Sequence, residues 1–303
     1  MIDLQARLGE RLLRDEPLAR YTAARLGGPA DWLYIARRSN AELVEVLTTC
    51  WEHDLPVHVI GGGANVLISD DGVRGLVVIN RVSTVDFLPE GQVRVSAGTG
   101  LTVLARKCAS RGLAGLEWAA SVPGTVGGAV VGNAGAHGGD MAGTVRAITL
   151  VDAQDGQRTI DVAQMAYGYR TSMLKARADR RFLVLDALVQ LTPDAPAQIE
   201  ARMDGFIAHR KRTQPPGASL GSIFKNPTGD YAGRLIQAAG LKGCAIGGAQ
   251  VSPVHANFFI NRGGATARDY HALIAHVRET VAAQFGVWLE PEIEILGENL
   301  KKF

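Results

Sequence analysis

The sequence predicts an α+β protein of two or three domains. Segments that alternate apolar and polar residues, as strands do, are interspersed with segments that show the 3.6-residue period of helices. The 303 residues exceed the roughly 100–200 residues of a typical domain. Hydrophobic residues make up 47% of the chain and charged residues 20%, which is typical of a globular protein and argues against disorder.

Short apolar runs bounded by turn residues predict strands. They lie at 31–36, 57–60, 66–69, 75–80, 93–98, 145–152, 157–160, 181–191 and 257–261. Helical periodicity predicts helices at 39–53, 101–111, 196–212, 231–239 and 267–285. Two of these helices begin with capping patterns, Ser39 with Glu42 and Thr266 with Asp269. We expect strand 66–69 to resume strand 57–60 after a glycine interruption, and the closing segment 288–297 to be a strand.

The character of the sequence changes near Val82 and again near Pro196. We therefore expect three domains, at 1–80, 81–195 and 196–303. The closing strand within 288–303 is a candidate to join the first of them.

The composition argues against several classes of protein. The net charge of +2 gives no basic field for nucleic acid or an anionic membrane. Cys50, Cys108 and Cys244 are odd in number and far apart, and no cysteine or histidine pair has zinc-ligand spacing. The N-terminal residues mix both charge signs and lack an apolar signal core. We expect a cytoplasmic protein without a metal site, and a monomer is the simplest expectation for its oligomeric state.

The uncharged stretch 118–136 approaches the length of a membrane span. Pro123 and five glycines make it a poor spanning helix, so we interpret it as a buried loop. Within it, Pro123 and Gly124 set a turn, and Thr125 and Asn133 offer polar side chains. Such a segment has a large conformational entropy to lose and little side-chain packing to gain, which favours a loop that binds a ligand.

An earlier glycine run, Gly61-Gly62-Gly63-Ala64-Asn65, lies between two short strands. Consecutive glycines allow backbone N–H groups to converge on an anion such as a diphosphate. A tight connection between strands explains the run equally well. The chain has no GxGxxG between a strand and a helix and no GxxxxGK[ST], which argues against a Rossmann dehydrogenase and a P-loop enzyme.

At these glycine loops the sequence resembles the UDP-N-acetylenolpyruvoylglucosamine reductase (MurB) family. The resemblance runs in order through nearly the whole chain. Its motifs are at 61–67, 122–129, 133–136, 167–170 (Tyr-Gly-Tyr-Arg), 221–227 (Gly-Ser-Ile-Phe-Lys-Asn-Pro), 247–252, 255–257 and 290–292 (Glu-Pro-Glu). Little sequence separates Arg170 from Ser222, so the chain resembles the shorter, type II form, without the longer form's mobile tyrosine loop. One departure is Ala64, where serine is common.

The resemblance implies a vanillyl-alcohol-oxidase-like fold, with two FAD-binding subdomains (1–80 and 81–195) and a C-terminal substrate domain (196–303). It implies non-covalent FAD, since no histidine lies within 61–65, and NADPH as hydride donor. The implied reaction reduces a UDP-sugar enolpyruvyl ether to UDP-N-acetylmuramate, a step of peptidoglycan synthesis. Because no second nucleotide fold is visible, we expect NADPH to enter the site that the sugar substrate vacates, in ping-pong turnover.

The resemblance also implies three catalytic residues. Arg170 would bind the substrate carboxylate, for which a permanently charged fork of N–H donors is suited. Ser222 would donate the proton, and Glu292 would orient or polarise the carboxylate. Glu290 and Glu294 share the parity of Glu292 on a strand, so only the resemblance selects among the three.

The predicted binding residues fall into two groups. Those for FAD are Gly61, Gly62, Gly63, Ala64, Asn65, Ser121, Pro123, Gly124, Thr125, Gly128, Asn133 and Ala136. Those for substrate are Lys225, Asn226, Gln250 and Lys211. Lys211 belongs to a run of basic residues that could bind a diphosphate. The run is explained equally well as the solvent-exposed C-terminal end of a helix, where positive charges are favourable. His255 and Asn257 belong with Gln250 to a polar cluster, in which a structural role is the expectation for His255.

Two other functions remain open. One is an FAD oxidase of the same broad fold, which would pass electrons to oxygen. The other is a UDP-sugar-binding protein that has lost catalysis. Arg170, Ser222 and Glu292 argue against both.

Overall fold

The computed structural model describes residues 4–300 and Phe303, and the chain divides into two compact units. Unit 1 comprises the residues up to Leu12, together with Tyr34–Gly62 and Leu76–Arg210. Unit 2 comprises Leu13–Leu33, Gly63–Gly75 and the residues from Lys211 onward. The division into domains 1–80, 81–195 and 196–303 stays a prediction. Among the described residues, no helix is both long and apolar enough to cross a membrane.

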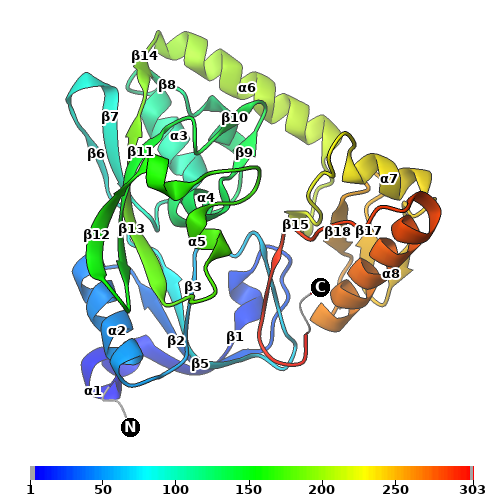
Figure 1. The fold of residues 1–303 in the computed structure, drawn as a ribbon, viewed down its shortest axis with the longest axis horizontal. Coiled ribbons are helices and arrows are strands. Elements are labelled where there is room, and N and C mark those ends of the chain that lie inside the picture. The colour runs from blue at the N-terminus through cyan, green and yellow to red at the C-terminus, as the bar shows by residue number, and fades with distance from the viewer. Residues whose placement is uncertain (1–3, 301–302) are drawn as a thin grey trace. The chain divides into compact units, whose positions relative to one another are not determined.

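An antiparallel five-stranded sheet forms the core of unit 1, in the order β12-β11-β13-β7-β6. Its strands are β6 (Val85–Phe87), β7 (Gln92–Ser96), β11 (Val145–Asp152), β12 (Gly156–Asp161) and β13 (Phe182–Gln190). Alternate residues point into the core, as Ile148 on β11 and Val93 and Val95 on β7 do. Helices α3 (Leu101–Ala109) and α4 (Val126–Gly132) contribute Leu104 and Val130 to the same buried cluster (Figure 1).

Shorter elements surround this sheet. They are α1 (Leu4–Leu8), the pairs β8 (Leu113–Ala114) with β14 (Thr192–Pro193) and β9 (Gly135–Ala136) with β10 (Gly139–Asp140), and α5 (Met173–Ala176). The long helix α6 (Pro196–Thr213) buries Ile199 and Met203 against the unit 1 core.

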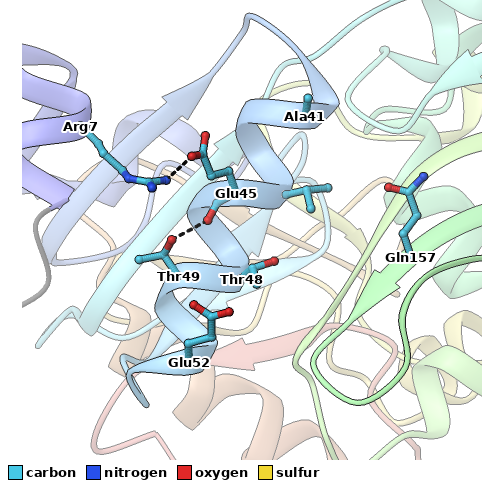
Figure 2. Close-up of a pocket in the computed structure, with 8 residues that line it drawn as sticks. Arg7, Ala41, Glu45, Thr48, Thr49, Glu52 and Gln157 are labelled. Carbon is cyan, nitrogen blue, oxygen red and sulfur yellow. Dashed lines mark hydrogen bonds and ion pairs between the residues drawn. The ribbon is translucent and has the colours of Figure 1, made fainter.

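A second sheet has the order β1-β2-β5-β3. Its strands are β1 (Leu12–Pro17), β2 (Pro29–Ala36), β3 (Val57–Ile60) and β5 (Val73–Asn80). Helix α2 (Asn40–Glu52) begins where Ser39 Oγ accepts a hydrogen bond from the Glu42 N–H at 3.1 Å, as the capping pattern predicts. A groove of about 520 Å³ runs along α2, where Arg7 pairs with Glu45 at 2.6 Å (Figure 2). None of the predicted site residues lines this groove.

Unit 2 contains a four-stranded sheet in the order β15-β18-β17-β16. Its elements are β15 (Ala218–Ser222), β16 (Ala245–Ile246), β17 (Ala249–Val251), β18 (Phe258–Asn261), α7 (Ala232–Ala238) and α8 (Ala267–Phe285). In Figure 1, α7 and α8 lie beside this sheet. Thr266 and Asp269 form the predicted capping box of α8, and Asp70 accepts hydrogen bonds from the next two N–H groups, at 2.8 and 3.0 Å.

Three differences from the sequence predictions bear on the site. The stretch 118–136 is no continuous loop, because α4 forms within it and buries Val126, Ala129 and Val130 on one face. Strand β4 (Val66–Ile68) does not resume β3 but pairs in parallel with β19 (Glu294–Leu296). The closing strand is therefore shorter than predicted, and the argument that Glu290, Glu292 and Glu294 share one strand face is wrong, since only Glu294 lies in β19.

A buried carboxylate at the end of β11 yields a prediction for stability. The side chain of Asp152 is fully buried, and it pairs with Arg158 at 2.7 Å and Arg177 at 3.0 Å. Burial raises the pKa of Asp152, but the hydrogen bonds from both arginines and from the Gln154 and Asp155 N–H groups outweigh it, so the net pKa is lowered. A lowered pKa in the folded state stabilises the fold above the unfolded pKa of about 3.9.

We expect Asp152→Asn to lower the free energy of unfolding at pH 7 by roughly 3 kcal/mol, because the two guanidinium groups lose their buried partner. The difference from the wild type should shrink as the pH falls below about 4, where the unfolded chain takes up the proton. Urea unfolding at several pH values between 7 and 3 measures this difference in the free energy of unfolding. Asp155→Asn, at a neighbouring exposed carboxylate, is the control and should cost less than about 1 kcal/mol. A pH-independent loss would contradict the assignment.

Candidate active site

The two glycine loops meet in unit 1. A Cβ on Gly62 would lie 2.8 Å from Gly124 Cα, and one on Gly61 would lie 2.2 Å from Thr125 Oγ1. The second loop is fixed in turn to the end of β7, since Leu101 N–H donates to Gly124 O and Val126 N–H donates to Thr99 O. Gly62 therefore packs on backbone, and Gly61 on the Thr125 side chain, where both loops were predicted to bind a ligand. A Cβ at either position would be too close to the second loop.

Polar atoms beside these loops suit a ligand. In the part of the chain that the structure describes, Ser121 Oγ, Trp118 Nε1 and Tyr167 OH are buried without a hydrogen-bond partner. A buried polar group left unpaired costs about 1–3 kcal/mol, so such groups usually meet a ligand or water. Ser121 is one of the predicted FAD-binding residues. Trp118 is not among the residues that the sequence predicted to bind FAD. The glycine cradle and these donors fit a dinucleotide with a polar ring system.

Arg170 lies near the second loop. Its Nη2 donates to Gly135 O at 2.8 Å and its Nη1 to Asn133 O at 3.4 Å. Asn133 ends α4 in the left-handed conformation, and its Nδ2 donates to Gly168 O at 2.9 Å. Arg170 itself has a φ of 56°, a conformation that is rare without glycine and that clusters at functional sites. The structure thus brings Arg170 together with Asn133 and with Gly135 of β9, the residue before the predicted Ala136.

Ser222 and Glu292 meet in unit 2 through a short backbone ladder. Glu292 N–H donates to Ile223 O at 2.8 Å, and Lys225 N–H donates to Glu290 O at 2.9 Å. Phe224 and Pro291 form the bridge between these two bonds. The chain segment of Ser222 thus runs antiparallel to that of Glu292, although 70 residues separate the two in sequence.

Ser222 lines a cleft of about 590 Å³ in unit 2. The other lining residues are Asn226, Tyr231, Gly233, Arg234, Gln237, Ala238, Val254, His255 and Asn257. The sequence predicted only Asn226, His255 and Asn257 among these, and Tyr231 and Arg234 are the largest side chains that it did not identify. Arg234 pairs with Asp230 one turn earlier and lowers the pKa of that carboxyl to about 2. Their position directly after the Gly-Ser-Ile-Phe-Lys-Asn-Pro motif was the available signal.

The polar cluster of His255, Asn257 and Gln250 is chiefly structural. Asn257 is buried, and its side chain bonds both the N–H and the carbonyl of Phe224, at 2.9 and 2.8 Å. His255 Nδ1 accepts the Asn257 N–H at 3.2 Å, and burial lowers the pKa of His255, which favours the neutral ring. Gln250 donates to Gly243 O at 3.0 Å. The structural role expected for His255 agrees with these contacts.

The remaining predicted substrate residues differ in their contacts. Lys225 Nζ pairs with Glu290 Oε1 at 2.5 Å, and Asn226 Oδ1 accepts the Ala232 N–H at the start of α7. Lys211 is exposed near the end of α6. Neither Gln250 nor Lys211 lines the cleft, so their binding roles stay predictions. Among the described residues, no three His, Cys, Asp or Glu side chains lie close enough together to hold a metal ion.

Two family models match the chain. Residues 33–160 match the model of an FAD-binding domain, and residues 213–296 match the model of the UDP-N-acetylenolpyruvoylglucosamine reductase C-terminal domain. The predicted α+β fold with an FAD-binding part and a C-terminal domain of this family is thereby confirmed.

Relatives match over nearly their whole length. UDP-N-acetylenolpyruvoylglucosamine reductase 2 of Symbiobacterium thermophilum is 44% identical, over 95% of this chain and 93% of its own. The reductase of Moorella thermoacetica is 43% identical, over 98% and 97%. The crystal structure of the Thermus caldophilus reductase superposes with a TM-score of 0.81 at 34% identity, covering 95% of this chain and 99% of that one. The chain therefore belongs to the UDP-N-acetylenolpyruvoylglucosamine reductase family of FAD-dependent oxidoreductases.

Proposed function

We propose that the chain reduces UDP-N-acetylglucosamine enolpyruvate to UDP-N-acetylmuramate with NADPH, as a cytoplasmic monomer in peptidoglycan synthesis. The observation that carries the proposal is the backbone pairing of the segment that follows Ser222 with the segment of Glu292, since Ser222 itself lines the cleft of unit 2. The pairing holds a proton-donor candidate and a carboxylate on neighbouring antiparallel segments. The names of the relatives support the substrate.

FAD, when bound, would supply hydride transfer from NADPH to the double bond of the enolpyruvyl ether. The glycine loops would hold its diphosphate, with Gly61, Gly62, Gly124 and Thr125 forming the cradle and Ser121 Oγ offering a hydroxyl. A side chain at either glycine would collide with the second loop and push the two loops apart. Their close packing would hold the cofactor and exclude water from it.

The reaction puts negative charge on the substrate carboxylate and leaves a carbon that needs a proton. Arg170 would stabilise that charge, because its guanidinium is permanently ionised and its direction is fixed by two carbonyl contacts. Ser222 would deliver the proton to the carbon. A serine hydroxyl is a weak acid, so it needs charged neighbours or a water chain to reprotonate it. Lys225 and Asn226 would hold the nucleotide-sugar.

The spectrum of the purified protein tests this function. We expect a yellow protein whose flavin absorbance near 450 nm is bleached by NADPH without oxygen and returns when the enolpyruvyl sugar is added. Return of colour only with oxygen would favour an FAD oxidase. A protein that neither holds flavin nor reacts would favour a UDP-sugar-binding protein without catalysis.

We expect ping-pong turnover, because NADPH and the sugar would use one site in turn. Initial rates measured at several fixed concentrations of the second substrate should give parallel lines in double-reciprocal plots. At high sugar concentration, NADPH should be displaced, so the sugar should inhibit competitively with NADPH. Intersecting lines would show that both substrates bind together and would contradict a shared site.

A further inference from the structure

Asn65, the last residue of the first glycine loop, holds the segment that carries Glu292. Its Nδ2 donates to Glu292 O at 3.1 Å, and its own carbonyl accepts the Glu294 N–H at 2.9 Å. These two bonds lie on either side of Ile293. From there the parallel pairing of β4 with β19 continues, Val66 opposite Glu294.

The opposite edge of the same segment is held by the strand of Ser222. Glu292 N–H donates to Ile223 O at 2.8 Å, so both backbone polar groups of Glu292 are occupied. The N–H of Glu292 is bonded to Ile223, next to the proton-donor candidate Ser222, and its carbonyl is bonded to Asn65 of the glycine loop. The two peptide planes that flank Glu292 are thereby held, and with them the direction in which its side chain leaves the backbone.

We propose that Asn65 is a positioning residue for Glu292 and acts through this backbone contact. The proposal rests on the function proposed above, and it replaces the FAD-binding role that the resemblance implied for Asn65. An N–H of the Asn65 side-chain amide is directed to a protein carbonyl, that of Glu292. Misplacement of a catalytic group by 1 Å can slow a reaction about 100-fold, so a single amide at this place affects the rate.

Two variants separate this role from cofactor binding. Asn65→Ala removes the donor, and Asn65→Asp replaces it with an acceptor that repels the Glu292 carbonyl. We expect FAD affinity of the apoprotein, measured by flavin fluorescence, to stay within about threefold of the wild type, because one neutral hydrogen bond elsewhere changes little. Flavin reduction by NADPH should be similarly unchanged. Reoxidation by the enolpyruvyl sugar should slow about 10- to 100-fold, more for Asn65→Asp.

Coupling to Glu292 gives a second readout. The rate losses of Asn65→Ala and Glu292→Gln should not multiply in the double variant, because both act on one carboxylate. The pH profile of reoxidation should lose the same limb in either single variant. Amide hydrogen exchange of residues 290–294 should quicken in Asn65→Ala even without substrate, since the segment has lost the hydrogen bond from Asn65 Nδ2 to Glu292 O.

Asn261→Ala is the matched control. Asn261 Nδ2 also donates to a backbone carbonyl in unit 2, that of Ala24 at 2.9 Å. Because Asn261 Oδ1 also accepts the N–H groups of Gly263 and Ala265, this variant should lose at least as much stability as Asn65→Ala and keep reoxidation and the exchange of 290–294 unchanged. The proposal would be overturned if Asn65→Ala weakened FAD affinity and left reoxidation normal. Rate losses that multiply in the double variant with Glu292→Gln would also overturn it, and so would an equal slowing of reoxidation in Asn261→Ala. If the enolpyruvyl sugar did not reoxidise the flavin of the wild type, the proposed function would be wrong, and this inference would be wrong with it.

Discussion

Replacing Ser222 by alanine is expected to stop turnover after the flavin has been reduced. Ser222 lies at the end of β15 and lines the cleft, while Ile223 next to it bonds Glu292. Its hydroxyl is the proton donor proposed for the carbon of the former double bond. General-acid catalysis of this kind contributes about 10²- to 10⁴-fold to a rate, so we expect a loss of that size in kcat.

The two half-reactions locate the defect. Under anaerobic stopped flow, NADPH should bleach the flavin of Ser222→Ala as fast as that of the wild type, whereas reoxidation by the sugar should stall. Ser219→Ala, on the same strand and outside the cleft lining, is the control and should reoxidise normally. Ser222→Cys should recover part of the rate, because a thiol with a pKa of about 8.5 is a competent donor. Normal reoxidation by Ser222→Ala would show that another group supplies the proton.

The sequence predicted those features that local chemistry decides. Helix α8 begins and ends at the predicted residues, because the Thr266–Asp269 capping box and Gly286 define its two ends within a few residues of chain. Local rules failed for α4. Its glycines lower helix propensity, and only burial of Val126, Ala129 and Val130 in the unit 1 core makes the helix stable.

Long-range pairings were beyond local rules for a different reason. Val66 and Glu294 pair across 228 residues, and nothing in either segment alone identifies the other as partner. The parity argument for the three glutamates assumed one regular strand, but the chain enters β19 only at Glu294. The motif resemblance selected Glu292 without that geometry. Asn65 was assigned to the cofactor because its loop was identified, whereas its bonding partner could be found only in the folded chain.

Replacing Gly62 by alanine is expected to weaken FAD binding roughly 10- to 100-fold. The new Cβ would lie 2.8 Å from Gly124 Cα, and a backbone atom cannot turn away as a side chain can. Overpacking of this kind costs about 1–3 kcal/mol, and each 1.4 kcal/mol is a factor of ten in affinity. Fluorescence titration of the apoprotein with FAD measures the change. Gly205→Ala, in the exposed part of α6 with no atom within 4 Å of the new Cβ, is the control.

Comparison with Gly61 separates the cradle from general misfolding. A Cβ at Gly61 would meet the Thr125 side chain, with Oγ1 at 2.2 Å, instead of backbone. Thr125→Ala removes that oxygen, so it should restore much of the free energy of unfolding lost in Gly61→Ala and none of that lost in Gly62→Ala. Urea unfolding measures this in the three single variants and in the two double variants that combine Thr125→Ala with Gly61→Ala or Gly62→Ala. Wild-type FAD affinity in Gly62→Ala would mean that the cofactor does not depend on the contact between the loops, and equal rescue of both variants would mean that the backbone of Gly124 yields.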